Sequence, residues 1–277
     1  MKHLEGTFNG VRDLVIYHQA WIPEGEIKAS ILIVHGLGEH CGRYTNVVNY
    51  LVPKGYALYG FDLPGHGKSE GEREFVKEFG DYTQTVTAVF NIVQAEQPGK
   101  PVFLLGHSMG GLIACYYLLD HSDDFKGGII SAPAITVPEN TTQGTITLAK
   151  LLSKLMPKLG MMQLDANDIS RDPEVVKVYQ NDPLVFNGKT PVRLMAEMLK
   201  AMIRVDQDME KISLPILILQ GTEDVLALPV GAKKLHQQAG STDKTLMLYE
   251  GLYHEVFNEP EHEQVLGDVA AWLDAHL

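Results

Sequence analysis

The sequence predicts an α/β fold, in which helices cover both faces of a mostly parallel central sheet and one helical segment is inserted. Short apolar runs alternate with segments of helical periodicity along most of the 277 residues. Residues 31–34 are apolar at every position, which is typical of a strand buried on both faces. No comparable run lies between Ser131 and Ile216, an interval too long for one crossover. We therefore expect a helical cap inserted at residues 133–210.

The expected strands stop at glycine or polar residues, where loops begin. In chain order they cover residues 15–21, 31–34, 56–61, 102–105, 128–131, 216–219 and 246–249. The expected helices cover residues 82–93, 109–119, 145–156, 193–203 and 230–239. Before the first of these strands, Asn9-Gly10 is expected to form a two-residue hairpin turn, because both residue types tolerate a positive φ. We expect residues 1–277 to form a single domain.

The composition excludes several classes of protein. Asp plus Glu number 35 against 23 for Lys plus Arg, and the net charge of -12 disfavours binding to nucleic acid. Two cysteines, Cys41 and Cys115, cannot form a disulfide framework, and we expect both to be unpaired. No run reaches the length of a membrane span, and no apolar leader follows Met1. We expect a cytoplasmic enzyme or binding protein.

A candidate nucleophile lies in the sequence Gly106-His107-Ser108-Met109-Gly110, which matches G-x-S-x-G. It directly follows the strand expected at 102–105 and opens the helix expected at 109–119. This strand, turn and helix are the setting of a nucleophile elbow, in which a tight turn lifts the serine hydroxyl above the sheet. His107 precedes the nucleophile and is expected to be structural.

A serine hydroxyl needs a base to become a nucleophile, and the base needs an acid to orient it. Both are expected after Ser108, at the carboxyl ends of later strands. Asp224 follows the strand expected at 216–219, and His254 follows the strand expected at 246–249. Glu223 is the alternative acid. We predict a catalytic triad of Ser108, Asp224 and His254.

Acyl transfer also needs backbone N–H groups that stabilise the negative charge on the carbonyl oxygen. One is expected from Met109, the residue after the nucleophile. The other is expected from Leu37, in the loop His35-Gly36-Leu37-Gly38 that follows the strand at 31–34. Glycines in this loop allow a close approach of the backbone to a substrate.

Several segments together resemble the α/β-hydrolase superfamily, and within it the branch of monoacylglycerol lipases and lysophospholipases (serine aminopeptidase S33-like). They are residues 35–40 (HGLGEH), 62–71 (DLPGHGKSEG), 106–111 (GHSMGG), 179–184 (YQNDPL), 220–224 (QGTED) and 249–254 (YEGLYH). The resemblance covers nearly the whole chain from about Phe8 and includes the expected cap. It implies an α/β-hydrolase fold with that cap inserted.

The resemblance implies a hydrolase that cleaves single-chain glycerol esters without a cofactor. It places Glu39, Arg43 and Tyr179 at the glycerol end of the site. Phe257 stands where some animal members of the branch have a second histidine. Asp62 and His66 belong to a loop that is architectural in this family.

Other functions remain open at this point. A lysophospholipase would be favoured by an arginine cluster, such as Arg171, Arg193 and Arg204, at the entrance of the site. A short-chain carboxylesterase, an acyltransferase that uses the same acyl-enzyme, and a catalytically silent binding protein are further alternatives. The order of His35, Glu39 and His40 is not that of a metalloprotease, so we expect no metal. The oligomeric state is not predicted.

The helix expected at 145–156 carries a stripe of leucines at 148, 151, 152 and 155, with Lys150 and Lys154 beside it. The stripe is expected to roof the acyl site. A second hypothesis is that the same helix makes transient contact with a membrane or micelle surface, so that a poorly soluble ester can enter directly.

Overall fold

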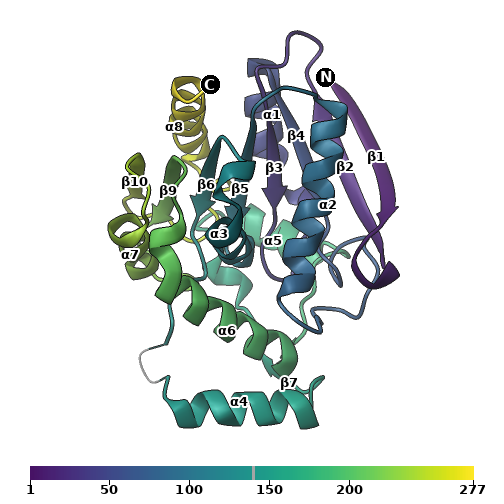
Figure 1. Ribbon diagram of the computed structural model, residues 1–277, viewed down its shortest axis with the longest axis vertical. Coiled ribbons are helices and arrows are strands. Elements are labelled where there is room, and N and C mark those ends of the chain that lie inside the picture. The colour runs from purple at the N-terminus through teal and green to yellow at the C-terminus, as the bar shows by residue number, and fades with distance from the viewer. Residues whose placement is uncertain (139–140) are drawn as a thin grey trace.

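The computed structural model describes residues 1–138 and 141–277, and its centre is one eight-stranded sheet (Figure 1). The strand order is β1-β2-β4-β3-β5-β6-β9-β10. Six strands are parallel: β3 (Ala29–Val34), β4 (Tyr56–Phe61), β5 (Val102–His107), β6 (Gly127–Ser131), β9 (Ile216–Gly221) and β10 (Lys244–Tyr249). The hairpin of β1 (Lys2–Asn9) and β2 (Val15–Ile22) is antiparallel to them at one edge. The α/β fold predicted from the sequence is confirmed.

The apolar strands divide their side chains between two hydrophobic cores, one on each face of the sheet. In β3, Leu32 and Val34 belong to one core, whereas Ile31 and Ile33 belong to the other. All four side chains are completely buried. Successive residues of a strand point to opposite faces, so a strand covered on both sides must be apolar throughout.

Five helices cover the two faces of the sheet. The first core lies under α2 (Gly80–Glu96), α3 (Met109–His121) and α7 (Pro229–Gln238), and the second under α1 (Thr45–Leu51) and α8 (His262–Ala275). The predicted stripe on α2 is confirmed, since Tyr82, Val86, Val89 and Val93 are fully buried. The helices α1 and α8 were not among those expected from the sequence.

The predicted two-residue turn at Asn9-Gly10 is wrong. Asn9 still belongs to β1 and pairs with Val15, so residues 10–14 form the connection. Arg12 and Asp13 both adopt positive φ, at 55° and 60°. The Arg12 side chain reaches α2, where its Nε donates to Asp81 at 2.8 Å. This partly buried ion pair holds the five-residue connection against α2, in place of the two-residue turn that Asn9-Gly10 would form.

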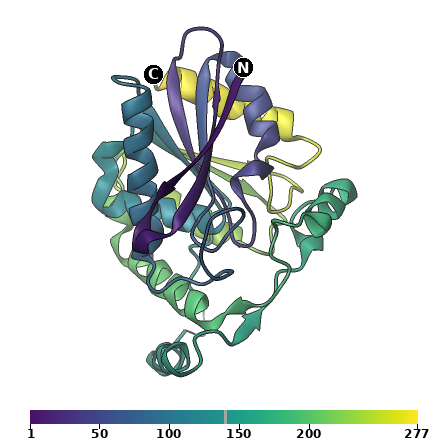
Figure 2. The ribbon, with the colours of Figure 1, turned by 90° about the vertical axis from the view of Figure 1, so that its right-hand side faces the viewer.

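The segment between β6 and β9 lies at the carboxyl ends of the parallel strands, and both chain termini lie at the opposite end (Figure 2). It contains α4 (Gln143–Leu155), α5 (Pro173–Asn181) and α6 (Val192–Asp208). It also contains a small sheet of β7 (Gly160–Met162) and β8 (Thr190–Pro191), although no strand was expected here. Strands this short show no periodicity in the sequence.

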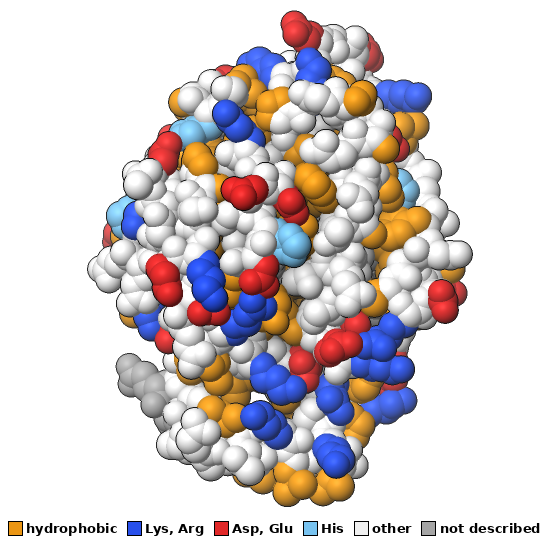
Figure 3. All heavy atoms as spheres, in the orientation of Figure 1, with side chains coloured by type: hydrophobic (Ala, Val, Ile, Leu, Met, Phe, Trp, Pro, Cys, Tyr) orange, Lys and Arg blue, Asp and Glu red, His pale blue; other side chains and the backbone are white. Residues whose placement is uncertain are grey.

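Helix α4 is the outermost element of this segment. The leucines of its apolar stripe lie partly against a cavity and partly in solvent. Leu148 and Leu152 line a cavity beneath the helix. Leu148, Leu151 and Leu155 are nevertheless 54%, 51% and 67% exposed to solvent. Orange side chains gather accordingly at the lower end of the surface in Figure 3, where α4 lies. No helix within 1–138 or 141–277 is long and apolar enough to cross a membrane.

Candidate active site

Ser108 lies in the tight turn between β5 and α3, with a positive φ of 55° and a ψ of −119°. The turn depends on its two glycines because the backbone approaches other backbone closely. A Cβ on Gly106 would lie 2.4 Å from the carbonyl oxygen of Gly110, and a Cβ on Gly110 would lie 2.1 Å from that of Val34. The elbow predicted from G-x-S-x-G is therefore present, at the start of a helix whose first amides are free.

Asp224 and His254 meet although 30 residues separate them, because β9 and β10 are neighbours and each residue follows one of these strands. The Nδ1 atom of His254 lies 2.8 Å from Oδ2 of Asp224. His254 also lines the same cavity as Ser108. The side chain of Glu223, the alternative acid, is exposed. The geometry thus favours Asp224.

The carboxylate of Asp224 is held in its ionised form. Burial would raise its pKa, but hydrogen bonds from His254, the Ala227 amide and the Gln220 side chain lower the pKa below its ordinary value. The amides of Leu226 and Ala227 donate to Oδ1 at 2.8 and 2.9 Å, and Gln220 Nε2 donates to Oδ2 at 2.9 Å. An ionised acceptor at Nδ1 leaves Nε2 of His254 free to act as a base.

Leu37 and Met109 lie on either side of Ser108 at the wall of the same cavity. Leu37 follows β3, and the preceding residue approaches the nucleophile, since a Cβ on Gly36 would lie 3.2 Å from the Ser108 Cβ. Met109 is the first residue of α3. Leu37 and Met109 thus remain the residues whose backbone N–H groups we propose for an oxyanion hole.

Glu39, Arg43 and Glu255 form a buried ion cluster beside the triad, here called the Arg43 cluster. Arg43 contacts Glu39 at 2.8 Å and both oxygens of Glu255 at 2.6 and 2.8 Å. Glu39 in turn accepts the Gly36 amide at 2.6 Å. The cluster links the loop of His254 to the loop of Leu37, and sequence reasoning did not predict the contribution of Glu255.

Burial alone would raise the pKa of Glu255, but the Arg43 guanidinium lowers the pKa to about 2. Arg43 also lies 4.6 Å from the ring centre of Tyr179. Glu39 and Tyr179, together with Ser108 and His254, line a small cavity of about 20 Å³. The three residues expected at the glycerol end therefore do gather next to the triad.

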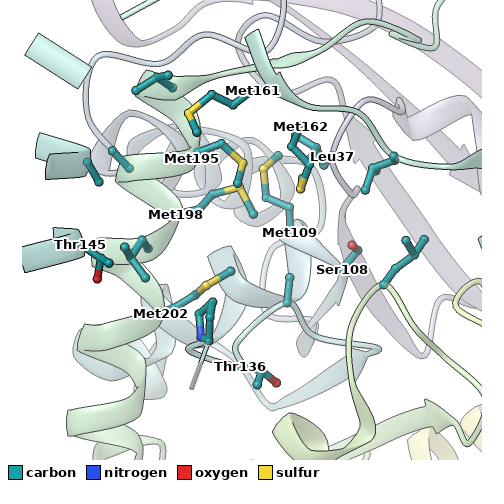
Figure 4. Close-up of a pocket in the computed structure, with 18 of the residues that line it drawn as sticks. Leu37, Ser108, Met109, Thr136, Thr145, Met161, Met162, Met195, Met198 and Met202 are labelled. Atoms are coloured by element: carbon teal, nitrogen blue, oxygen red, sulfur yellow. The ribbon is translucent and has the colours of Figure 1, made fainter. Parts of the chain in front are cut away.

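A much larger cavity of about 500 Å³ opens on the other side of Ser108 (Figure 4). Its walls are almost entirely apolar and come from α3, from the loop after β6, and from α4, β7 and α6. The apolar residues include Ala134, Leu148, Leu152, Met162, Leu164, Val192, Met195 and Met198. A cavity of this size and polarity suits a hydrocarbon chain.

Three arginines considered as a phosphate site do not form a cluster. Arg171 pairs with Glu259 at 2.7 Å, and Arg204 pairs with Asp120 at 2.6 Å. Arg193 donates to the Ser153 carbonyl at 2.8 Å. None of them is among the residues lining the large cavity.

His107 is buried, and burial lowers its pKa to about 3, so it is neutral. Its Nδ1 lies 3.2 Å from the Ser131 hydroxyl, and its ring centre lies 4.7 Å from that of His254. Asp62 accepts the amides of Cys41 and Lys68 at 2.9 and 2.7 Å. These contacts fit the structural roles expected for His107 and for the loop of Asp62.

Comparison with known proteins gives consistent matches over nearly the full length. Residues 25–261 match the model of the family described as serine aminopeptidase, S33. A monoacylglycerol lipase of Mycolicibacterium smegmatis is 35% identical over 99% of this chain and 98% of its own. A monoglyceride lipase of Rattus norvegicus is 37% identical over 95% of this chain and 88% of its own. The crystal structure of a monoacylglycerol lipase from Paleococcus ferrophilus superposes with a TM-score of 0.82, at 32% identity and with complete coverage of both chains.

Ser108→Ala is expected to lower kcat by a factor on the order of 10⁴ to 10⁶ and to leave the melting temperature nearly unchanged, because only the nucleophilic oxygen is lost. Ester hydrolysis and labelling by a fluorophosphonate probe would be measured for both proteins. A variant that keeps more than about a tenth of the activity contradicts this role for Ser108. A wild-type protein that the probe does not label would instead be catalytically silent.

Asp224→Asn is expected to lower kcat by roughly 10⁴, since an amide no longer fixes the tautomer of His254. Glu223→Gln is the matched control and should change kcat little, because the Glu223 side chain is exposed. Steady-state kinetics on one soluble ester suffice for the comparison. Equal losses in the two variants would show that the acid is wrongly assigned.

Proposed function

The chain belongs to the serine aminopeptidase S33 family of α/β-hydrolases, and from this premise we propose that it is a monoacylglycerol lipase, which releases a fatty acid and glycerol. The observation that carries the proposal is the placement of Ser108 between two unlike cavities. The first is almost entirely apolar and about 500 Å³, and the second is about 20 Å³ and brings Glu39, Tyr179 and His254 together with apolar residues. A single acyl chain and a small polar head group match this pair, whereas a triglyceride has two further chains to accommodate.

The residues support a two-step mechanism. The Ser108 hydroxyl attacks the ester carbonyl while Nε2 of His254 takes its proton, and the amides of Leu37 and Met109 stabilise the resulting oxyanion. The intermediate collapses when His254 returns the proton to the leaving glycerol oxygen, which leaves the acyl group on Ser108. Water, deprotonated by His254, then attacks the acyl-enzyme and releases the fatty acid. Asp224 stays ionised and stabilises the imidazolium in both steps.

In this proposal residues 133–210 act as a cap that roofs the acyl chain. Helices α4 and α6 and strand β7 supply most of the apolar wall, which the main sheet alone would leave open. Burying a chain in this cavity contributes roughly 0.8 kcal/mol per methylene, so long-chain esters gain most.

Glu39, Arg43 and Tyr179 form the glycerol end of the site in this proposal. The Glu39 carboxylate already accepts hydrogen bonds from the Gly36 amide, from Arg43 and from the Tyr44 hydroxyl. The Tyr179 hydroxyl, by contrast, donates no hydrogen bond to any residue that the structure describes. It is therefore free to contact a hydroxyl of the glycerol.

A lysophospholipase is the second candidate, and the arginines decide against it. The phosphate of a lysophospholipid carries a charge that needs cationic partners at the head-group end. Arg171 and Arg204 are instead paired with carboxylates. The Arg43 cluster beside the triad has one cation, Arg43, which two glutamates already neutralise.

We also propose that the cap touches lipid surfaces, as a cytoplasmic enzyme with a peripheral contact would. Leu151, Leu155 and Leu159 form an exposed group, here called the α4 patch, and are 44% to 67% exposed. Leu151 and Leu155 belong to α4 and Leu159 follows it, and Lys150 and Lys154 are exposed on the same helix as the first two. Apolar side chains that enter the lipid, flanked by cations that meet anionic head groups, suit weak and reversible binding.

The proposed activity is tested by comparing kcat/KM across substrates. Long-chain monoacylglycerols should exceed triacylglycerols and lysophospholipids by at least about tenfold, or 1.4 kcal/mol of transition-state stabilisation. Diacylglycerols and nitrophenyl esters complete the panel, and added alcohol acceptors reveal any acyl transfer. A preference for lysophospholipid, or acyl transfer faster than hydrolysis, would overturn the proposal.

Tyr179→Phe is expected to raise KM for monoacylglycerol about three- to tenfold, the range for losing one hydrogen bond. The same variant should leave KM for a nitrophenyl ester unchanged, because that substrate has no glycerol. The ring that contacts Arg43 is retained. A similar change for both esters would mean that Tyr179 acts on the site's shape rather than on glycerol.

Leu151→Ser combined with Leu155→Ser is expected to lower binding to anionic phospholipid vesicles about tenfold and to slow hydrolysis of micellar more than monomeric substrate. The matched control is Val230→Ser with Leu248→Ser, two exposed apolar residues outside the cap. Vesicle co-sedimentation and activity would be measured for both. If the α4 variant binds vesicles as well as the wild type does, the α4 patch does not bind lipid surfaces.

A further inference from the structure

Methionine is concentrated around the acyl cavity. The chain has ten methionines, and six of them line this one cavity: Met109, Met161, Met162, Met195, Met198 and Met202. All but Met109 come from the segment between β6 and β9, on β7 and α6 (Figure 4). A hydrocarbon site could be built from leucine and isoleucine alone, so the walls contain more oxidisable sulfur than chain binding requires.

The methionines that line the cavity differ in their exposure to solvent. Met161 on β7 is 58% exposed, so the cavity reaches solvent beside it. Met198 is 7% exposed, and Met109, next to the nucleophile, is fully buried. A water-soluble oxidant therefore reaches Met161 more readily than Met198 or Met109.

The cysteines do not compete for such an oxidant. Cys41 and Cys115 are both buried. Burial raises the pKa of the Cys115 thiol to about 12 and that of the Cys41 thiol well above its ordinary value. Because the thiolate is the reactive form, both thiols are inert at neutral pH.

We propose that Met161 is a reversible oxidation site through which hydrogen peroxide narrows the enzyme's range of acyl chains. The thioether sulfur uses a lone pair to attack one peroxide oxygen, the O–O bond breaks, and one molecule of water leaves after proton transfer. The sulfur loses two electrons and becomes the sulfoxide, while the peroxide is reduced. A methionine sulfoxide reductase with a dithiol reverses the change.

The consequence follows from the polarity of the sulfoxide. An alkyl chain that passes Met161 would have to remove water from a strongly polar S–O group without offering it a hydrogen bond, which opposes binding. The acetyl group of nitrophenyl acetate has one carbon beyond its carbonyl, so it stays beside Ser108 and should be unaffected. Oxidation should therefore lower the activity toward long chains alone, and this inference rests on the proposed function.

The test treats the full-length enzyme with a limited amount of hydrogen peroxide and follows oxidation of each methionine by peptide mass spectrometry. The ratio of kcat/KM for a long-chain monoacylglycerol to that for nitrophenyl acetate should fall about five- to tenfold as Met161 gains one oxygen. Reduction by methionine sulfoxide reductases A and B should restore the ratio. No change in the ratio at full oxidation of Met161, or a loss that reductases do not reverse, overturns the inference.

Two variants test whether oxidation of Met161 causes the fall in the kcat/KM ratio. The treated activity of each variant is divided by the activity of the same variant before treatment. Met161→Leu keeps an apolar wall without oxidisable sulfur and should abolish the response to peroxide. Met156→Leu is the matched control, because Met156 is 50% exposed but does not line the cavity, and it should respond as the wild type does. A response that survives in Met161→Leu overturns the assignment. If untreated enzyme does not hydrolyse long-chain monoacylglycerol, the proposed function fails instead.

Discussion

The turn that carries Ser108 is the constraint around which the rest of the molecule is arranged. The Ser108 backbone has a positive φ, which residues other than glycine rarely adopt. Backbone oxygens of Val34 and Gly110 leave no room for a Cβ at the two glycines of the turn. Strain of this kind persists only if the surrounding structure is rigid. The fully buried parallel strands on both sides of β5 supply that rigidity, and they also end at the edge where the acid, the base and the Leu37 loop are needed.

The two halves of the site differ in their physical construction. The groups that perform the chemistry follow strands of one sheet and are fixed by hydrogen bonds, such as the four that hold the Asp224 carboxylate. The groups that line the large cavity come mainly from the segment between β6 and β9, and five of those from this segment are methionines, whose side chains are flexible and unbranched. A fixed reaction centre is thus combined with an adaptable chain site, so that changes in the cap can alter specificity without disturbing the triad.

Local sequence signals were sufficient for the parallel strands and for the pairing of Asp224 with His254. Each parallel strand was predicted to within two residues. Five of the six are buried at every position and so are mostly apolar, whereas β10 is largely half-buried. Asp224 and His254 could be predicted because each follows one of these strands. Glu255 could not be predicted as a partner of Arg43, since 212 residues separate them and only the packed fold brings them together. The same holds for the loop at Arg12, whose shape depends on an ion pair with α2 rather than on its own turn residues.

The Arg43 cluster has a consequence for how the molecule opens. It joins Gly36, through Glu39, to Glu255, the residue after the base. Separating either loop from the other would leave a buried charge without its partner, which costs about 3–5 kcal/mol. Thermal fluctuations that expose one loop must therefore release both, and the two segments form one cooperative unit of local unfolding. In the proposed mechanism Leu37 supplies one oxyanion donor and His254 is the base, so both are lost in the same event while Met109 stays on α3. A partly opened molecule therefore lacks the base that would activate Ser108.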